Sequence, residues 1–297
     1  MTRLRADALL LFTAMIWGTA FIAQKIGNES MGPMAFVAAR SLLSAAMLLP
    51  FALYEKKRQT EPLTRRDYAI VIAVGLLLFT GGSLQQIAMM TASATHGGFL
   101  TALYIVIVPF ASWIMTRERV RPLVVAACVV SITGAWLLTY RGEQGSWQTS
   151  DILLVVSDFA WAFWIVLIGL FLKTAQRPFF LAFMQFAITG VVALPLSLIF
   201  EHTTLPGLQT ALPALLFTGI ISGGFAFTLQ IFAQKHTPPA EAALIMSLES
   251  VFAALAGAWL LGERLGYLAM IGCAMILAGA IVAEVVPTLM RGRNAKL

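Results

Sequence analysis

The sequence predicts an all-α polytopic membrane protein in which ten transmembrane helices form two inverted five-helix repeats. Composition is the first reason, because 59% of the 297 residues are hydrophobic, only 11% are charged, and the mean hydropathy is +0.85. The other two reasons are an internal repeat and an uneven distribution of basic residues. Backbone polar groups must be paired within a bilayer, so apolar segments of about 20 residues cross it as helices.

Ten apolar segments are long enough to cross the hydrocarbon core. In chain order they cover residues 6–26, 33–53, 68–90, 95–116, 123–140, 151–171, 178–199, 211–233, 239–261 and 267–286. The first is longer than the apolar core of a signal peptide and no small-x-small cleavage site follows it, so we expect it to remain as a span. The connections are short, and they leave little chain for a separate catalytic or regulatory domain.

The second half of the chain repeats the first at an offset of about 145 residues. Identical residues recur in pairs at this offset: Gln85 and Gln230, Ala88 and Ala233, Leu103 and Leu248, Cys128 and Cys273, Gly134 and Gly279. A slip of one residue also pairs Trp17 with Trp161. Since each copy holds five spans, an odd number, the copies face opposite sides of the membrane, which is typical of carriers that alternate access.

Glycines and polar residues interrupt the apolar pattern between residues 141 and 150. We therefore predict that residues 1–141 form the first repeat and residues 151–287 the second. Residues 288–297, which include three basic residues, are expected to form a cytoplasmic tail.

Basic residues lie mainly on one side of the predicted membrane. Sixteen of the twenty Lys and Arg residues fall at the termini and in the alternate loops that share their side, whereas the opposite loops hold only Lys25, Arg141 and Arg264. By the positive-inside rule both termini are cytoplasmic, and we expect the chain in a bacterial inner membrane. The net charge of +6 therefore reflects topology rather than binding to nucleic acid.

Four parts of the sequence carry a resemblance to a known family. They are Ala8–Ile22 (ALLLFTAMIWGTAFI), Arg40, Thr95–Arg119 and Ala240–Leu265 (AEAALIMSLESVFAALAGAWLLGERL). Together they resemble the drug/metabolite transporter superfamily, and within it the ten-helix EamA-type permeases, which include amino-acid exporters. The resemblance covers nearly the whole chain. It implies a carrier whose central cavity is lined mainly by helices 1, 3, 4, 6, 8 and 9, with helices 5 and 10 at the periphery.

The chain departs from the family pattern in the ninth span. Many relatives have Pro after the Glu of this span, where this chain has Glu249-Ser250. Because Pro removes a backbone hydrogen bond and kinks a helix, a hinge at this point cannot be carried over from the relatives.

Three charged residues lie well inside predicted spans, away from their ends: Arg40, Asp158 and Glu249. Inserting each charged side chain into the membrane costs about 2.5–3.5 kcal/mol of free energy, so we expect each to have a structural or functional role. Glu249 lies near the middle of its span, where carriers place substrates and coupling protons, and its repeat partner is Tyr104. It is a candidate to exchange a proton or to hold a substrate amine. The alternative is a structural carboxyl that bonds a neighbouring helix.

Arg40 and Asp158 are each seven residues inside the same end of their spans. At 1.5 Å per residue both lie about 10 Å deep, so we expect them to form an ion pair or to bind jointly the carboxylate and amine of a zwitterion. The alternative is that Arg40 extends outward to the interface and Asp158 faces a wet vestibule.

Aromatic residues repeat on two predicted helix faces. Trp17 and Phe21 share one face of the first helix, and Trp161 and Trp164 lie one turn apart on the sixth. A Trp provides a flat apolar wall and one N–H donor, which suits an aromatic or amphipathic cargo. We therefore expect these four residues, with Tyr104, to line the cavity; the alternative is that the Trp residues pack between helices.

Gln85 and Gln230 are repeat partners inside spans. A buried amide must find hydrogen-bond partners. Substrate and a neighbouring helix satisfy that need equally, so both remain candidate substrate contacts.

These observations favour a secondary transporter that exports a small metabolite, an amino acid or a related amphipathic compound, by alternating access. Within transport, the alternatives are a drug or organic-cation exporter and a nucleotide-sugar antiporter. A membrane-embedded lipid enzyme is disfavoured because the three histidines are scattered, so we expect no enzymatic activity, metal or cofactor. The expected partners are a small-molecule substrate and membrane lipid, without nucleic acid, for a monomer or homodimer.

Overall fold

The computed structural model describes the chain except for residues 60, 118–120, 140–147, 263, 265 and 295–297. All ten predicted spans are helical over most of their described residues, and the described part of the chain contains no strand. Eight helices or joined helices are long and apolar enough to cross a membrane, and shorter apolar helices at Pro122–Leu137 and Met270–Gly279 complete the ten. The predicted fold class is therefore confirmed. The expected boundary between the halves lies mostly outside the described residues.

The first half consists of six helices. They are α1 (Arg3–Ser30), α2 (Pro33–Arg58), α3 (Arg65–Ala88), α4 (Ala94–Thr101), α5 (Tyr104–Thr116) and α6 (Pro122–Thr139). Because α4 and α5 together make one span, the half has five spans.

The second half follows the same order of spans. Its elements are α7 (Thr149–Thr174), α8 (Pro178–Phe200), α9 (Leu205–Leu216), the π-helix η2 (Phe217–Ala226), α10 (Phe227–Gln234), α11 (Pro239–Met246), α12 (Glu249–Leu260) and α13 (Tyr267–Asn294). The run from α9 to α10 is one span, and α11 with α12 is another. Most of the predicted tail, residues 288–294, continues α13, and residues 295–297 lie outside the described part.

The repeat-related helices α2 and α8 lie side by side and cap each other. The Glu201 carboxylate, just past the end of α8, accepts hydrogen bonds from the first-turn N–H groups of Met34 (2.9 Å) and Ala35 (2.8 Å) in α2. In the same way Glu55 in α2 accepts from Phe179 (3.2 Å) and Phe180 (2.8 Å) in α8. A carboxylate suits a helix N-terminus because it satisfies unpaired N–H groups and faces the positive end of the dipole. Each copy therefore caps the other at opposite ends of the bundle, as an inverted repeat requires.

A second pair of contacts obeys the same symmetry. The Ser44 hydroxyl in α2 donates to the carbonyl of Gly219 in η2 at 2.6 Å. Its repeat partner Thr189 in α8 donates to the carbonyl of Gly75 in α3 at 3.1 Å. Both glycines allow the close approach, because an added Cβ at either would overlap a side chain of the facing helix. Hydrogen bonds and small residues of this kind hold helices together where lipid supplies no hydrophobic drive.

Two spans are broken at repeat-related positions. The fourth span is interrupted at Ala102 and Leu103, between α4 and α5, and the ninth at Ser247 and Leu248, between α11 and α12. At both breaks the backbone turns to tighter i to i+3 hydrogen bonds, and a mid-helix tightening of this kind often marks a hinge. The second half-helix of each pair then begins at Tyr104 and at Glu249, respectively.

The ninth span breaks although it lacks the proline of many relatives. Serine hydroxyls replace it: Ser247 donates to the Leu244 carbonyl and Ser250 to the Ser247 carbonyl, both at 2.8 Å. Such local bonds compete with the helical ladder and bend it. In the fourth span Pro109 has no N–H to donate to the Ile105 carbonyl, which instead receives the Cys128 thiol at 3.5 Å.

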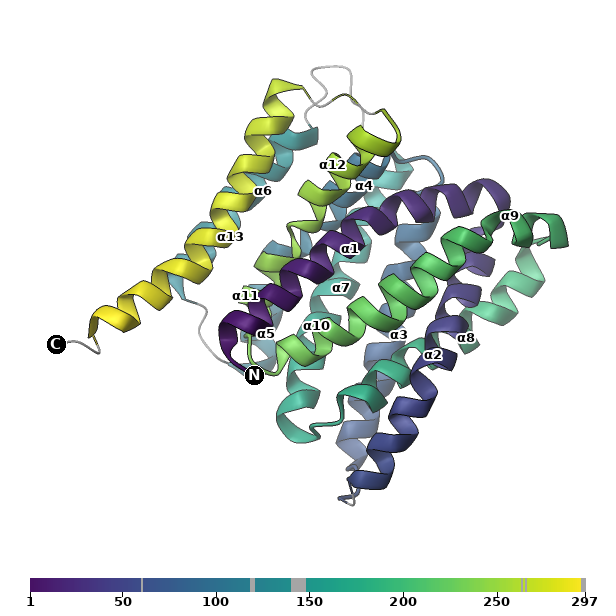
Figure 1. Cartoon of the computed structure of the whole chain (residues 1–297), viewed down its shortest axis with the longest axis horizontal. Helices are drawn as coiled ribbons and strands as arrows, with labels where there is room; N and C mark the ends of the chain where they lie inside the picture. The colour runs from purple at the N-terminus through teal and green to yellow at the C-terminus, as the bar shows by residue number, and fades with distance from the viewer. Residues whose placement is uncertain (60, 118–120, 140–147, 263, 265, 295–297) are drawn as a thin grey trace.

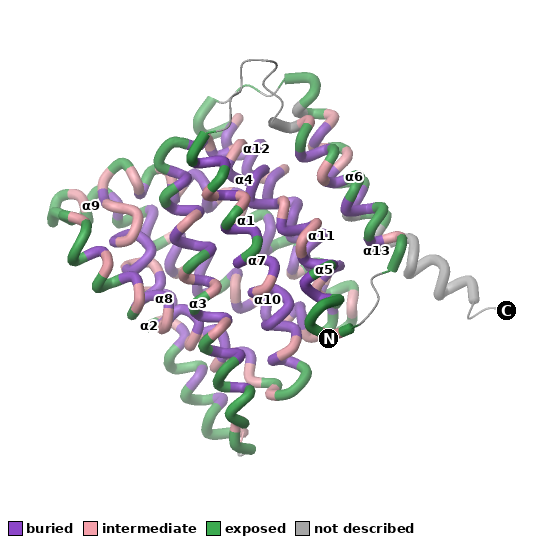
Figure 2. The backbone as a smooth tube through the Cα atoms, turned by 180° about the vertical axis from the view of Figure 1, so that it is seen from behind, coloured by how far each residue is buried: buried purple, intermediate pink, exposed green. Residues whose placement is uncertain are grey.

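The helices α6 and α13 form a pair at the edge of the bundle, as the family resemblance implies. Figure 1 shows them along one side, with α2 and α8 on the other. The pair packs closely because an added Cβ at Gly134 would overlap the Gly272 carbonyl, and one at Gly279 would overlap Ser131. Most of the buried interior lies among the remaining helices (Figure 2), and α6 adds Val124, Ala127 and Cys128 to it.

Loss of either reciprocal cap should destabilise the fold. Glu201→Ala leaves two N–H groups of α2 without an acceptor, which should lower the free energy of unfolding by about 1–3 kcal/mol; Glu55→Ala should do the same to α8. The comparison is Glu29→Ala, at an exposed position, in a thermal unfolding series in detergent. A loss no larger for Glu201→Ala than for Glu29→Ala would show that the caps do not stabilise the pair.

Candidate functional site

A cavity lies at the centre of the bundle between the two halves. It holds about 740 Å³ of space outside atoms, including its opening to solvent. Helices 1, 3, 4, 6, 8 and 9 contribute to its wall, as the resemblance implies, and α6 and α13 supply none of the lining residues. The second and seventh spans, α2 and α8, also contribute, which the resemblance did not imply.

Five aromatic rings form one wall of the cavity. Phe227 lies at the centre, 4.5 Å from Trp17, 5.4 Å from Trp164 and 5.2 Å from Phe186 between ring centroids. Trp161 adds an edge-to-face contact with Trp164 at 5.5 Å. Arrangements of this kind are stabilising beyond the area they bury. The wall is thus preformed rather than dependent on a ligand.

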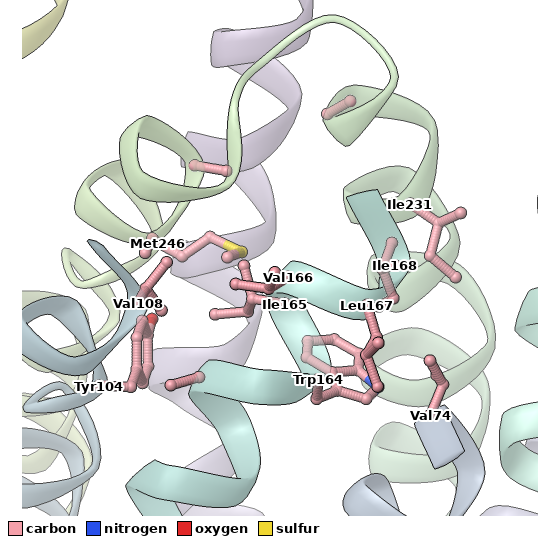
Figure 3. Close-up of a cluster of buried hydrophobic side chains, with 14 of the residues drawn as sticks. Val74, Tyr104, Val108, Trp164, Ile165, Val166, Leu167, Ile168, Ile231 and Met246 are labelled. Atoms are coloured by element: carbon pink, nitrogen blue, oxygen red, sulfur yellow. The ribbon is translucent and has the colours of Figure 1, made fainter. Parts of the chain in front are cut away.

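The wall is fixed from behind by the core of α7. Figure 3 shows Trp164 followed along α7 by Ile165, Val166, Leu167 and Ile168, all of which are buried. The Trp164 indole N–H donates to the Gln185 side-chain oxygen at 3.0 Å, which holds the ring in place.

Two of the indole N–H groups have no partner. The N–H of Trp17 and that of Trp161 are buried and make no hydrogen bond in the described part of the chain, and both residues line the cavity. Trp161 lies directly against α3 because Gly81 has no side chain, and an added Cβ there would be 3.0 Å from the ring. A buried donor without an acceptor costs free energy, so a hydrogen-bond acceptor on a bound molecule would remove that cost and favour binding.

Arg40 supplies a positive charge to the cavity. Its guanidinium makes no ion pair or hydrogen bond with the described residues. It lies 5.8 Å from the centre of the Phe36 ring, and α3 passes close to it because Gly82 has no side chain. Nearby on the lining, the Gln85 side-chain N–H donates to the Gln24 side-chain oxygen at 3.0 Å. This part of the cavity is therefore polar, with an uncompensated cation.

Glu249 supplies a negative charge at the point where the ninth span breaks. It is the first residue of α12, is buried, and lines the cavity. Tyr104, the first residue of α5, places its hydroxyl beside the carboxyl without forming a well-aligned hydrogen bond. Figure 3 shows Tyr104 next to Val108, with Met246 of α11 close by. The repeat-related breaks thus bring Tyr104 and Glu249 to the same wall.

Two predicted site residues lie outside the cavity lining. Asp158 is fully buried on α7 beside Tyr104 and Glu249, and the described chain contains no ion pair between it and Arg40. The expected pair is therefore absent, because equal depth does not determine direction: Arg40 faces the cavity and Asp158 faces α5. Gln230 donates to Gln234, so it bonds within its own helix rather than lining the cavity.

The structure brings the other predicted residues together. Trp17, Phe21, Arg40, Gln85, Tyr104, Trp161, Trp164 and Glu249 all line the cavity. The sequence prediction missed several lining residues, namely Gln24, Ser41, Thr101, Phe186, Thr189, Thr218, Ser222 and Phe227. The spacing of Gln24 was a usable signal, since it follows Trp17 and Phe21 on one face of α1. No periodic signal was available for Thr218 and Ser222, because they lie on the π-helical η2.

Comparisons with known proteins agree with this architecture. An uncharacterized transporter of Archaeoglobus fulgidus is 29% identical over 282 residues, covering 95% of this chain and 86% of its own. The uncharacterized transporter YwfM of Bacillus subtilis is 27% identical, with 94% and 93% covered. The uncharacterized inner membrane transporter YedA of Escherichia coli K12 is 23% identical, with 90% and 87% covered.

A solved crystal structure shares the fold. It superposes with a TM-score of 0.76 at 17% identity, covering 95% of this chain and 98% of the other. The EamA-like transporter family matches the chain twice, at residues 4–140 and 148–284. The chain therefore belongs to the EamA-like transporter family, within the drug/metabolite transporter superfamily.

Proposed function

We propose that this protein is a secondary transporter that exports a small amphipathic zwitterion, an amino acid or related compound, by alternating access. The observation that supports this most directly is the distribution of charge in the cavity. Arg40 offers a cation without a partner to a carboxylate, Glu249 offers a carboxyl to an amine, and the aromatic wall lies on the same cavity. Arg binds carboxylates with two parallel hydrogen bonds, which fixes orientation as well as charge.

The zwitterion proposal differs from the pairing expected from sequence. Asp158 does not line the cavity, so we assign the contact with the substrate amine to Glu249. The unpaired N–H groups of Trp17 and Trp161 add donors for a carboxylate, and the aromatic faces suit an apolar or cationic side of the cargo. These contacts favour an aromatic or large apolar amino acid.

Other cargoes fit the cavity less well. A purely cationic drug would have to bind beside the uncompensated Arg40. A nucleotide sugar carries a diphosphate, for which a single deep arginine is a poor match. We also propose that the partners are limited to this substrate and membrane lipid, without nucleic acid, and that the chain acts as a monomer or homodimer.

The orientation that we propose places both termini in the cytoplasm of a bacterium. The excess of basic residues at the end of the bundle that holds the N-terminus supports it, and so does the E. coli relative named as an inner membrane transporter. Export is the proposed direction because the chain resembles a family that includes amino-acid exporters.

Alternating access is supported by repeat-related contacts at the two ends. At the end that holds the N-terminus, Glu241 at the start of α11 bonds Arg3 of α1 and lies 3.4 Å from Arg121. At the opposite end its repeat partner, His96 of α4, lies 2.8 Å from Asp151 of α7. Opening one end requires breaking one contact while the other is kept, so we propose these two contacts as the cytoplasmic and exterior gates.

A counterflow assay tests the substrate class. Purified protein in liposomes should exchange at least one aromatic or large apolar amino acid, because the cavity complements a zwitterion with an apolar side chain. The panel also includes amphipathic cations and a nucleotide sugar, with and without a pH gradient. Transport of cations alone, or of no panel member, would contradict the proposal.

Substitutions of Arg40 and Glu249 should weaken the binding of different ligands. Hydrogen bonds to charged groups contribute about 1.5–3 kcal/mol, so Arg40→Ala should weaken binding of the amino acid about 10- to 100-fold. It should leave the decarboxylated amine analogue unaffected. Glu249→Gln should instead spare the deaminated acid analogue. Lys25→Ala, a basic position that does not line the cavity, is the control; equal losses for all three ligands would refute the assignment.

Weakening one gate should expose the cavity to that side. His96→Ala removes a partly buried contact worth about 1 kcal/mol, which corresponds to a several-fold shift in population. In a variant with both native cysteines replaced by serine, a cysteine at Ser41 reports access to an impermeant thiol reagent. Labelling from the exterior should rise with His96→Ala and fall with Glu241→Gln. The same direction of change for both variants would rule out paired gates.

A further inference from the structure

Asp158 is a buried carboxyl that does not line the substrate cavity. Its exposed fraction is 0%, and neither carboxyl oxygen has a hydrogen-bond partner in the described part of the chain. It lies on α7 one turn before Trp161, but unlike Trp161 it does not line the cavity. A buried, unpartnered carboxyl within the membrane calls for a functional explanation.

Two residues act on Asp158 electrostatically. One is Tyr104 of α5, whose backbone N–H faces the Asp158 carboxyl, and the other is Glu249 of α12, whose carboxyl lies within electrostatic range. The other helices packed on α7, which are α3, α4, α10 and α11, bring no charged group to it. The Tyr104 hydroxyl lies beside Glu249. Tyr104 therefore lies between two carboxyl groups, and neither carboxyl forms an ion pair with a cationic side chain of the described residues.

Two carboxylates cannot both stay ionised in such surroundings. Taking an unpaired charge out of water is very costly, and a second negative charge nearby adds repulsion. The aspartic-protease dyad shows the usual outcome, in which two neighbouring carboxyls share one proton. Here the two groups differ in access, because Glu249 lines the cavity and Asp158 does not.

We propose that Asp158 and Glu249 form a binding site for one proton, with Asp158 as its cavity-remote position. When the proton is on Glu249, the Asp158 carboxylate faces the Tyr104 N–H at the start of α5. An anion is favoured there because the first N–H groups of a helix lack partners and the dipole is positive. When a substrate amine makes Glu249 ionise, the proton moves to Asp158. The proton is only transferred between the two carboxyls, so its count is conserved.

This transfer changes the interaction at the break in the fourth span. A protonated Asp158 is a weaker acceptor for the Tyr104 N–H, so its attraction to the start of α5 weakens as Glu249 gains its partner. The break in the ninth span begins with Glu249 itself. The site therefore links the charge in the cavity to both broken helices. The repeat equivalent of Asp158 is Ala14, so only the second half has a buried carboxyl at this position.

The proton site can be tested without any substrate, which separates it from the proposed function. Infrared difference spectroscopy of the purified full chain at pH 7 should show the C=O stretch of a protonated buried carboxyl. Either Asp158→Asn or Glu249→Gln should remove or shift that band, because one proton is shared. Glu29→Gln, at an exposed position in α1, is the control and should leave the band unchanged.

Three results would overturn the proposal. The first is an unchanged band in Asp158→Asn. If that variant does not fold, the second is a band in Glu249→Gln that titrates as in the wild type, since the pair would then be independent. The third is a band that disappears when sodium chloride replaces choline chloride, which would show a bound metal cation instead of a proton. Failure of the counterflow assay alone would leave these spectra intact and would refute only the substrate class.

Discussion

The structure depends on the antiparallel contact between α2 and α8, in which each helix is capped by a glutamate from the other. Glu55 and Glu201 are repeat partners, yet they act at opposite ends of the bundle. That arrangement follows from an odd number of spans per half. It fixes the axis about which the other pairs are placed, including the Ser44 and Thr189 contacts and the peripheral α6 and α13 pair. The central cavity is the space that this symmetry leaves between the halves.

The elements that the two halves share form the scaffold, and the positions at which the halves differ hold the candidate functional side chains. Both halves break a span at the same position, but the residue after the break is Tyr104 in one and Glu249 in the other. Asp158 has Ala14 as its counterpart. The eighth span contains the π-helical η2, whereas its counterpart α3 is regular, and π-helical segments frequently occur at functional sites. The carboxyl groups that we propose for binding cargo and a proton, Glu249 and Asp158, therefore have no equivalent in the first half, although both halves share the same order of spans.

Much of this was predictable because membrane physics leaves few choices. Hydropathy located the ten spans, and the cost of intramembrane charge singled out Arg40 and Glu249, which both line the cavity. The direction of a side chain was harder to predict: depth along a helix placed Asp158 level with Arg40 but could not give the rotation that turns it towards α5. Similarly, the break at Ser247 depends on hydroxyl-to-carbonyl bonds, whereas the absence of proline gave no sign of it. Gln230 was misplaced for the same reason, since its bond to Gln234 lies within one helix.

The central claim is that the two halves exchange conformations about this axis, so that one end opens while the other stays closed. The most direct measurement is the distance between pairs of spin labels at the two ends, Met90 with Ile152 and Leu4 with His236, all at exposed positions. With substrate or a change of pH, the account predicts two populations in which one distance lengthens while the other remains short. If both distances lengthen together, or neither changes under conditions that support transport, the inverted repeat would not be acting as an alternating carrier.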